Sequence, residues 1–267
     1  MANSLQGTAI AVTRPVAQAQ KLSSLILAEG GTPISFPLID IVPLGDYRQF
    51  DATIADLPSY DWAIFISSNA VQNGMPRVLQ QFPTLPAQLK FAAIGPMTAS
   101  ELMHLGAHQV LIPKDRFDSE SLLNLPEMQN MQGQRVMIFR GVGGREVLAD
   151  TLTARGAKVT FAECYRRINP QSSTETLETL WRNKQCQGIV VTSSEAMRHL
   201  LQMTANGTQE WIKQIKICVN HQRIAEEAQN IVAQHNVFLN LHVAEAPGDA
   251  AMLACLQHAL TPSSSHS

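Results

Sequence analysis

The sequence predicts two doubly wound α/β domains, each built on a parallel sheet, with pseudo-repeated halves. Three observations lead to this prediction: strand-like and helix-like segments alternate, the two halves resemble each other at a constant offset, and two proline-ended stretches interrupt the alternation. Alternation of strands and helices implies a parallel sheet that helices cover on both faces. The 267 residues are about twice a usual domain of roughly 100–150 residues, which agrees with two domains.

The strand predictions rest on short apolar runs, which are typical of buried parallel strands. Amphipathic stretches with helical periodicity lie between these runs. Strands are predicted at residues 8–12, 62–66, 91–94 and 109–112 in the first half, and at 135–139, 158–161, 189–191, 215–219 and 238–243 in the second. Helices are predicted at residues 17–29, 70–80, 98–105, 145–155, 175–183, 195–203, 222–232 and 249–260.

An internal repeat relates the two halves at an offset of 126 residues, the difference between positions 67 and 193. Ser67 and Ser68 fall on Ser193 and Ser194 within two similar segments. The same offset carries Gly7 onto Gly133, Arg14 onto Arg140, Lys90 onto Lys216 and Ala99 onto Ala225. Each match alone is weak and chance similarity between βα units is the alternative, but the constant offset favours a repeat.

Two stretches, residues 36–43 and 163–170, interrupt the alternation. Both end in proline and follow equivalent strands of the two halves. Proline disfavours helix in the residue before it, so both stretches are predicted to be extended linkers. Two such crossings would allow one domain to be inserted within the other.

Composition excludes several classes of protein. The formal net charge is −2 without a long basic run, which disfavours a nucleic-acid binder. The four cysteines are widely spaced and lack a CxxC pair, which indicates buried free thiols in a reducing compartment and no metal site. Neither a signal peptide nor a run of ~20 apolar residues is found, so the protein is expected to be cytoplasmic, with no membrane partner.

The candidate binding residues follow the predicted strands, because ligands of open parallel sheets bind beyond the carboxyl ends of the strands. Serine, threonine and asparagine at these positions cap helices, and this capping role is one interpretation. The other is anion binding, because a helix N-terminus presents free N–H groups and the positive end of its dipole. The candidates are Arg14, Ser67, Ser68, Asn69, Thr98, Arg140, Gly143, Gly144, Arg145, Thr192, Ser193 and Ser194.

The loop RGVGGRE at residues 140–146 is the sharpest single motif. Its glycines would let a ligand approach the backbone, and its arginines can grip carboxylates in a bidentate manner. It matches neither GxGxxG nor a P-loop, so a nucleotide site is disfavoured. No GxSxG and no carboxylate pair stand out. The chain therefore supplies many binding groups and few catalytic ones, which suits a reaction that mainly needs its substrate held in one shape.

Several motifs in this order and spacing resemble the bacterial uroporphyrinogen-III synthase family over residues 8–260. The resemblance implies two α/β domains joined by a two-stranded β ladder, with the active site in the cleft between them. The ladder would consist of residues 36–43 and 163–170. The first domain would consist of residues 1–36 and 170–260, and the inserted domain of 41–164. The end of the sequence, TPSSSHS at 261–267, is expected to be a disordered tail. The motifs are VTRP at 12–15, PLI and IVP within 37–43, YDWAIFISSNAV at 60–71, IGPMTA at 94–99, RGVGGRE, YRR at 165–167, VVTSSEAM at 190–197 and APGD at 246–249.

The resemblance also implies a cofactor-free lyase that acts on hydroxymethylbilane, a linear tetrapyrrole with many carboxylates. Such an enzyme expels water and closes the ring with ring D inverted, so that it directs a ring closure that also occurs spontaneously. Orientation of this kind can replace on the order of 7–11 kcal/mol of barrier. Hand-over of the substrate from the preceding enzyme is a further expectation.

Tyr165 matches the family's tyrosine at the ladder, which implies that it assists departure of the hydroxyl; a purely structural aromatic is the alternative. Thr98 matches a threonine of the family's cleft. The loop 220–223 departs from the family pattern, which puts its contacts in doubt. Two other functions stay open: a non-catalytic two-domain protein that binds small anions, and a nucleotide-sugar transferase, which would need a nucleotide loop.

Overall fold

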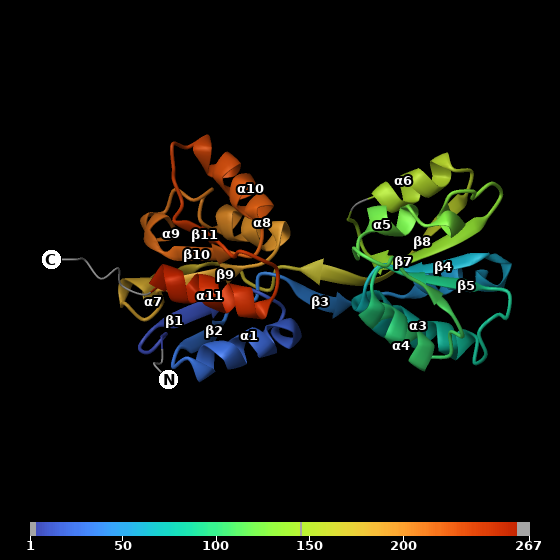
Figure 1. Ribbon diagram of the computed structural model, residues 1–267, viewed down its shortest axis with the longest axis horizontal. Helices are drawn as coiled ribbons and strands as arrows, with labels where there is room; N and C mark the ends of the chain where they lie inside the picture. The colour runs from blue at the N-terminus through green and yellow to red at the C-terminus, as the bar shows by residue number, and fades with distance from the viewer. Residues whose placement is uncertain (1–3, 145, 261–267) are drawn as a thin grey trace. The chain divides into compact units, whose positions relative to one another are not determined.

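The structure is a computed structural model that describes residues 4–144 and 146–260 (Figure 1). The chain forms two compact units, and it passes between them at residues 40–41 and again at 167–168. Unit 1 contains the described residues of Met1–Asp40 and Ile168–Ser267, and unit 2 contains those of Ile41–Arg167. Both units are α/β structures on a parallel sheet, which confirms the predicted fold class. The predicted tail, 261–267, lies outside the described residues.

Unit 1 has a five-stranded parallel sheet between two layers of helices (Figure 1). Side chains alternate between the faces of each strand, so that Ile10 and Val190 pack with α1 and α11, whereas Ala11 and Ile189 pack with the other helices. The sheet order is β2 (Thr32–Ser35), β1 (Ala9–Val12), β9 (Gly188–Val191), β10 (Lys216–Val219) and β11 (Leu241–Val243). The helices are α1 (Val16–Ala28), α7 (Glu175–Arg182), α8 (Ser194–Met203), α9 (Glu210–Gln214), α10 (Gln222–Ala233) and α11 (Asp249–Leu260).

Unit 2 has a six-stranded sheet in which five neighbouring strands pair in parallel. Phe65 and Phe139 are stacked, with ring centroids 4.2 Å apart, on the face covered by α3, and Ile64 and Ile138 lie on the face covered by α5 and α6. The sheet order is β3 (Asp40–Pro43), β8 (Lys158–Ile168), β7 (Arg135–Gly141), β4 (Trp62–Phe65), β5 (Lys90–Ala93) and β6 (Val110–Leu111). The helices are α2 (Arg48–Ile54), α3 (Ser68–Gln81), α4 (Pro96–His104), α5 (Ser119–Leu123) and α6 (Val147–Ala154), with short 3-10 turns at Leu57–Ser59 and Pro126–Met128.

The internal repeat is visible in both sheets. Strand β4 begins at Trp62 and β9 at Gly188, and β5 begins at Lys90 and β10 at Lys216, so both pairs keep the 126-residue offset. The spatial order β2-β1-β9-β10-β11 of unit 1 corresponds to β8-β7-β4-β5-β6 of unit 2. Each unit therefore combines the first two strands of one half with the remaining strands of the other half.

The structure differs from the predicted elements in one long strand, in the start of another strand and in three short helices. Residues 158–168 form one strand of 11 residues, β8, where a strand and a separate linker were expected. Strand β11 begins at Leu241 instead of 238, because Phe238 is 80 % exposed and does not join the sheet. Helices α2, α5 and α9, with 7, 5 and 5 residues, were not predicted, since they have at most two turns in which to show a periodic pattern.

The four cysteines are free thiols, of which Cys164, Cys186 and Cys218 are buried and Cys255 is half-buried. Burial raises the pKa of Cys164 to about 12. A thiol with so high a pKa stays protonated and behaves as a small apolar side chain.

Candidate active site

Each sheet has one switch point, where neighbouring strands connect onward in opposite directions. In unit 1 it lies between β1, which leads outward to β2, and β9, which leads to β10 on the other side. In unit 2 it lies between β4, which leads to β5, and β7, which leads to β8. Ligands of doubly wound sheets bind beyond the carboxyl ends of the strands at such points. The loops that follow these strands contain most of the predicted site residues.

At the switch point of unit 1, side chains from three distant segments meet. The Thr13 hydroxyl donates to the carbonyl of Val190 at 2.8 Å. Arg14 Nε donates to Thr192 Oγ1 at 3.2 Å, and its Nη1 lies 2.5 Å from Asp249 Oδ1. The structure thus brings two predicted residues, Arg14 and Thr192, together and adds Asp249 to them. Asp249 belongs to the APGD motif of the sequence but was not among the predicted site residues.

The N-terminus of α8 completes this site in unit 1. Ser193 is the N-cap, and its Oγ accepts from the backbone N–H of Ala196 at 3.1 Å. Ser194 lies near Glu227 of α10, although its buried Oγ makes no hydrogen bond among the described residues; the nearby Ser194 hydroxyl and the ion pair with Arg198 lower the pKa of Glu227 from its usual range. The two serines therefore have different tasks: one caps the helix, and the other faces a neighbouring helix.

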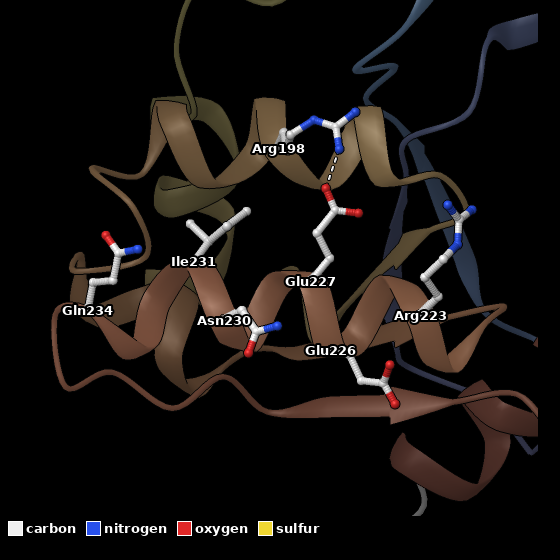
Figure 2. Close-up of a pocket in the computed structure, with 7 residues that line it drawn as sticks. All are labelled: Arg198, Arg223, Glu226, Glu227, Asn230, Ile231 and Gln234. Atoms are coloured by element: carbon white, nitrogen blue, oxygen red, sulfur yellow. Dashed lines mark hydrogen bonds and ion pairs between the residues drawn. The ribbon is translucent and has the colours of Figure 1, made fainter. Parts of the chain in front are cut away.

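A surface hollow of about 510 Å³ lies between α8 and α10. Figure 2 shows Arg198 of α8 reaching across it to Glu227 of α10, with Arg223 in the first turn of α10. Two arginines and two glutamates line this hollow, so their formal charges balance. Such a surface has no excess of positive charge with which to hold an anion.

Asn220, directly after β10, has a buried side-chain oxygen, Oδ1, without a hydrogen-bond partner among the described residues. A buried acceptor of this kind is unusual in native proteins and attracts a donor. Sequence reasoning singled out the loop 220–223 only as a departure from the family pattern. Nothing in the sequence signals that this oxygen is buried and unpaired.

In unit 2, four hydroxyl groups form a row along the carboxyl ends of the strands, which we call the hydroxyl row: Tyr165, Ser67, Ser68 and Thr98. The Tyr165 hydroxyl lies 3.4 Å from Ser67 Oγ, and Ser68 Oγ lies 3.5 Å from Thr98 Oγ1. Ser67 also caps α3, since its Oγ accepts from the backbone N–H of Ala70 at 3.2 Å. The row brings four predicted residues together from β8, α4 and the N-terminus of α3.

Tyr165 is held tightly at the end of this row. It is only 3 % exposed and packs within the core on the α3 face. Gly141 lies against its ring: a Cβ at this position would be 2.6 Å from Tyr165 Cε2. The close fit between Gly141 and the tyrosine ring determines where the Tyr165 hydroxyl lies.

Asn69, the next predicted residue after Ser68, accepts a hydrogen bond at its backbone carbonyl from Asn73 Nδ2 at 2.8 Å.

The glycine-rich loop after β7 is organised from within. Arg140 is 4 % exposed; its Nε donates to the carbonyl of Gly141 at 3.2 Å, and its Nη2 donates to that of Gly143. The backbone N–H of Gly143 donates to Glu163 Oε1 at 3.1 Å. Arg140 and the Gly143 amide therefore hold the loop in shape, although both were predicted to face a ligand.

Glycine is required at the turn of this loop. Gly143 and Gly144 have φ values of +70° and +106°, in the left-handed region that side chains disfavour. A Cβ at Gly144 would be 2.9 Å from Arg140 Nη2. Arg145, predicted to bind carboxylates, lies outside the described residues. Arg140 and Glu163 thus hold the loop in shape, and substrate binding by Arg140 stays a prediction.

No group of three or more His, Cys, Asp or Glu side chains within residues 4–144 and 146–260 is placed to hold a metal ion. No helix within the same ranges is long and apolar enough to cross a membrane.

The N-cap serines allow the capping and anion-binding roles to be separated. Ser193→Ala is expected to lower the free energy of unfolding by about 1 kcal/mol, because the cap of α8 is lost. Ser193→Asp keeps the cap, so the stability should stay within about 0.5 kcal/mol. If an anionic substrate binds at this turn, however, the aspartate should raise the KM for that substrate by about tenfold, because its own negative charge would lie next to that of the substrate. Denaturant unfolding and steady-state kinetics measure both; an unchanged KM would leave Ser193 with a capping role alone.

Known proteins resemble this chain over nearly its whole length. A family profile described as uroporphyrinogen-III synthase HemD matches residues 20–254. The chain is 35 % identical to the uroporphyrinogen-III synthase of Escherichia coli K12, over 93 % of this chain and 99 % of that protein. It is 33 % identical to that of Salmonella typhimurium LT2, with the same coverage of both.

Solved structures show the same fold. The crystal structure of a mutant uroporphyrinogen III synthase from the extremely thermophilic bacterium Thermus thermophilus superposes with a TM-score of 0.63 at 17 % identity, covering 95 % of this chain and 99 % of that one. The enzyme from Helicobacter pylori 26695 superposes with a TM-score of 0.54 at 14 % identity, covering 92 % and 97 %. At these identities the structures are similar in fold, and the family relationship depends on the sequence comparisons.

Proposed function

The chain belongs to the uroporphyrinogen-III synthase family, whose members are cyclising lyases of haem biosynthesis, and we propose that it closes hydroxymethylbilane into uroporphyrinogen III with ring D inverted. In this reaction the C–O bond to the hydroxyl group breaks and ring closure forms a C–C bond; inversion of ring D further requires that the C–C bond between ring D and its bridging carbon breaks and that a new one forms at the other α-position of the same ring. The hydroxyl group leaves as water once it has received a proton, and the carbon that closes the ring loses one. The reaction needs no redox cofactor, because no electrons are exchanged with a second reactant.

The observation that carries this proposal is the repeated construction of the two switch points. In both units a serine two residues after the end of a switch-point strand, Ser67 or Ser193, caps the next helix and leaves its first backbone N–H groups at the carboxyl edge of the sheet. Free N–H groups at a helix N-terminus bind carboxylates without a basic surface. A linear tetrapyrrole presents similar carboxylates along its length, which suits a protein with two similar receptors.

The positively charged predicted residues contribute to binding indirectly in this proposal. Arg14 is paired with Asp249 and bonded to Thr192, so it joins the first and last helices of unit 1 to the loop after β9. Arg140 and Glu163 hold the glycine-rich loop. Substrate carboxylates then meet backbone amides and hydroxyl groups on a scaffold in which Arg14 is ion-paired and Arg140 donates to backbone carbonyls of its own loop. Binding of this kind orients the substrate by geometry.

The hydroxyl row supplies the proposed chemical assistance in unit 2. Tyr165 has its hydroxyl 3.4 Å from Ser67 Oγ, next to the first turn of α3. A carboxylate held at this turn would bring the neighbouring pyrrole ring close to the tyrosine. Tyr165 then donates a hydrogen bond or a proton to the departing hydroxyl, directly or through Ser67.

A non-catalytic protein that binds small anions is the alternative, since fold alone does not determine function. The experiment that separates the two is incubation of the chain with hydroxymethylbilane, followed by oxidation and chromatographic separation of the ring isomers. The expected product is the inverted isomer, uroporphyrinogen III. A binding protein would leave only the isomer of spontaneous closure, in which ring D is not inverted, and that result would refute the proposal. Hand-over from the preceding enzyme and a cytoplasmic location stay predictions.

A further inference from the structure

Two of the four cysteines meet in the core of unit 1, although they belong to separate elements, Cys218 to β10 and Cys255 to α11. Successive side chains of a strand point to opposite faces of the sheet. Ile217 and Val219 therefore pack with residues of α8 and α10, whereas Cys218 packs on the other face, in the cluster that contains residues of α1 and α11. Cys218 is thus buried on the face that α11 covers.

Cys255 lies at the flank of the buried face of α11. Met252, Leu256 and Ala259 form that face, since they are buried and recur at helical spacing. Cys255 is three residues after Met252, and it is half-buried where it packs against the cluster that contains Cys218. The thiol of Cys255 is therefore reached from solvent more easily than that of Cys218.

The two thiols share a side-chain hydrogen bond, which makes them chemically unequal. This bond lowers the pKa of Cys255, whereas the same bond and burial raise the pKa of Cys218. Cys218 therefore stays protonated and donates, and Cys255 accepts and has the greater thiolate character. The thiolate is the reactive form of cysteine, and redox-sensitive cysteines often have a second thiol beside them.

The other two cysteines provide a contrast within the same chain. The Cys164 thiol donates to the carbonyls of Ala70 and Arg140, and the Cys186 thiol donates to the carbonyl of Gly188. Burial raises the pKa of both thiols. Access to solvent and a neighbouring thiol distinguish Cys255 from these two cysteines.

We propose that Cys218 and Cys255 form an oxidation site, at which a peroxide joins the two thiols into a disulfide between β10 and α11. The Cys255 thiolate attacks one oxygen of hydrogen peroxide, the O–O bond breaks, and the departing hydroxide takes up a proton and leaves as water. The Cys218 sulfur then attacks the sulfenic acid on Cys255, so that the S–S bond forms, the S–O bond breaks, and a second water leaves with the proton of Cys218. Two thiols together lose two electrons, and one hydrogen peroxide is reduced to two waters.

The oxidation site is separate from the proposed synthase reaction, because neither cysteine is among the residues proposed to bind or activate the substrate. Its disulfide would connect α11 covalently to the sheet of unit 1. Helix α11 begins at Asp249, which pairs with Arg14 at the switch point of the same unit. Oxidation would therefore fix the helix that supplies this carboxylate.

The test treats the intact chain with hydrogen peroxide, counts free thiols after denaturation and maps disulfides by peptide mass without reduction. The wild-type chain is expected to lose two of its four thiols, with the disulfide between Cys218 and Cys255, and to recover both with dithiothreitol. Cys164 and Cys186 should react at least about tenfold more slowly, because they are buried and protonated. Loss of no thiol, or a disulfide between other cysteines, would overturn the proposal.

Single variants assign the two thiols their roles. Cys218→Ala should still form a sulfenic acid on Cys255, which dimedone traps, but no disulfide. Cys255→Ser should slow oxidation of the Cys218 thiol by at least about tenfold. The control, Cys186→Ala, removes a buried thiol of the same unit and should form the disulfide within about twofold of the wild-type rate. Equal thiol loss in Cys255→Ser and in the wild-type chain would contradict the proposal. Circular dichroism verifies that each variant is folded, and the mapping of the wild-type chain needs no variant.

Discussion

Gly141→Ala is expected to abolish most of the ring-closing activity and to lower the free energy of unfolding by about 1–3 kcal/mol. The added Cβ would lie 2.6 Å from Tyr165 Cε2 and 2.8 Å from Cζ, distances at which atoms must move apart. The ring of Tyr165 is packed in the core, so it can yield only by shifting along with its hydroxyl. The hydroxyl would then leave its place beside Ser67, and we expect kcat to fall by roughly 100-fold.

Gly133→Ala is the matched control for this variant. Gly133 belongs to the same unit and has a φ of +74°, and a Cβ at this position would meet no atom within 4 Å. This substitution should therefore cost about 1–2 kcal/mol of backbone strain while leaving the kinetics unchanged. Denaturant unfolding and the isomer assay measure both variants. Full activity in a folded Gly141→Ala protein would show that the position of the tyrosine does not matter.

Tyr165→Phe should lower kcat by roughly 100-fold, near the lower limit of the about 10²–10⁴-fold that general acid catalysis contributes. The ring stays in the core, and only the hydroxyl group that faces Ser67 is removed. Stability should fall by about 0.5–1.5 kcal/mol at most, because one hydrogen-bonding group is lost. The KM should change little, since the carboxylates of the substrate are held elsewhere.

Tyr60→Phe separates loss of catalysis from loss of a buried hydroxyl. Tyr60 is also buried in unit 2, and its hydroxyl donates to Thr160 Oγ1 at 2.9 Å, but it precedes β4 and so lies at the other end of the sheet. It should lose similar stability and keep full activity. Adding Tyr165→Phe to Gly141→Ala should reduce kcat no further than Gly141→Ala alone does. Unchanged turnover of Tyr165→Phe would leave this tyrosine a structural role only.

Much of the fold could be predicted because buried parallel strands are apolar along their whole length. Strand β4, Trp62–Phe65, lies within the predicted run 62–66, and β5, Lys90–Ala93, overlaps the run 91–94. Strand β8 was divided wrongly, because residues 163–170 end in proline and were predicted to be a linker, and the polar residues Arg166 and Arg167, which the structure shows exposed, give no apolar run that would indicate a strand. A strand that is only partly buried lacks the continuous apolar signal.

The sequence was sufficient to predict which loops carry the candidate site residues, but not which of these residues contact one another. Loops after strands place Ser67 and Ser193 at helix N-termini, a local rule that needs only the neighbouring sequence. Tyr165 and Ser67 are 98 residues apart in the sequence, and Arg14 and Asp249 are 235 apart, so no local pattern relates them. Whether an arginine faces a ligand or its own loop depends on what packs around it, as Arg140 shows.

The hydrophobic periodicity and the glycine and proline residues at the ends of elements are local properties of the sequence. They were sufficient to specify the fold class, the repeat and the loops that carry hydroxyl groups. The pairing of β1 with β9 and of β4 with β7 came from the folded chain, because it depends on which apolar faces are buried together. The same holds for the buried guanidinium of Arg140 and for the hydroxyl row. Side chains acquire these roles from neighbours that are distant in sequence, whose positions are set by the packing of the whole unit.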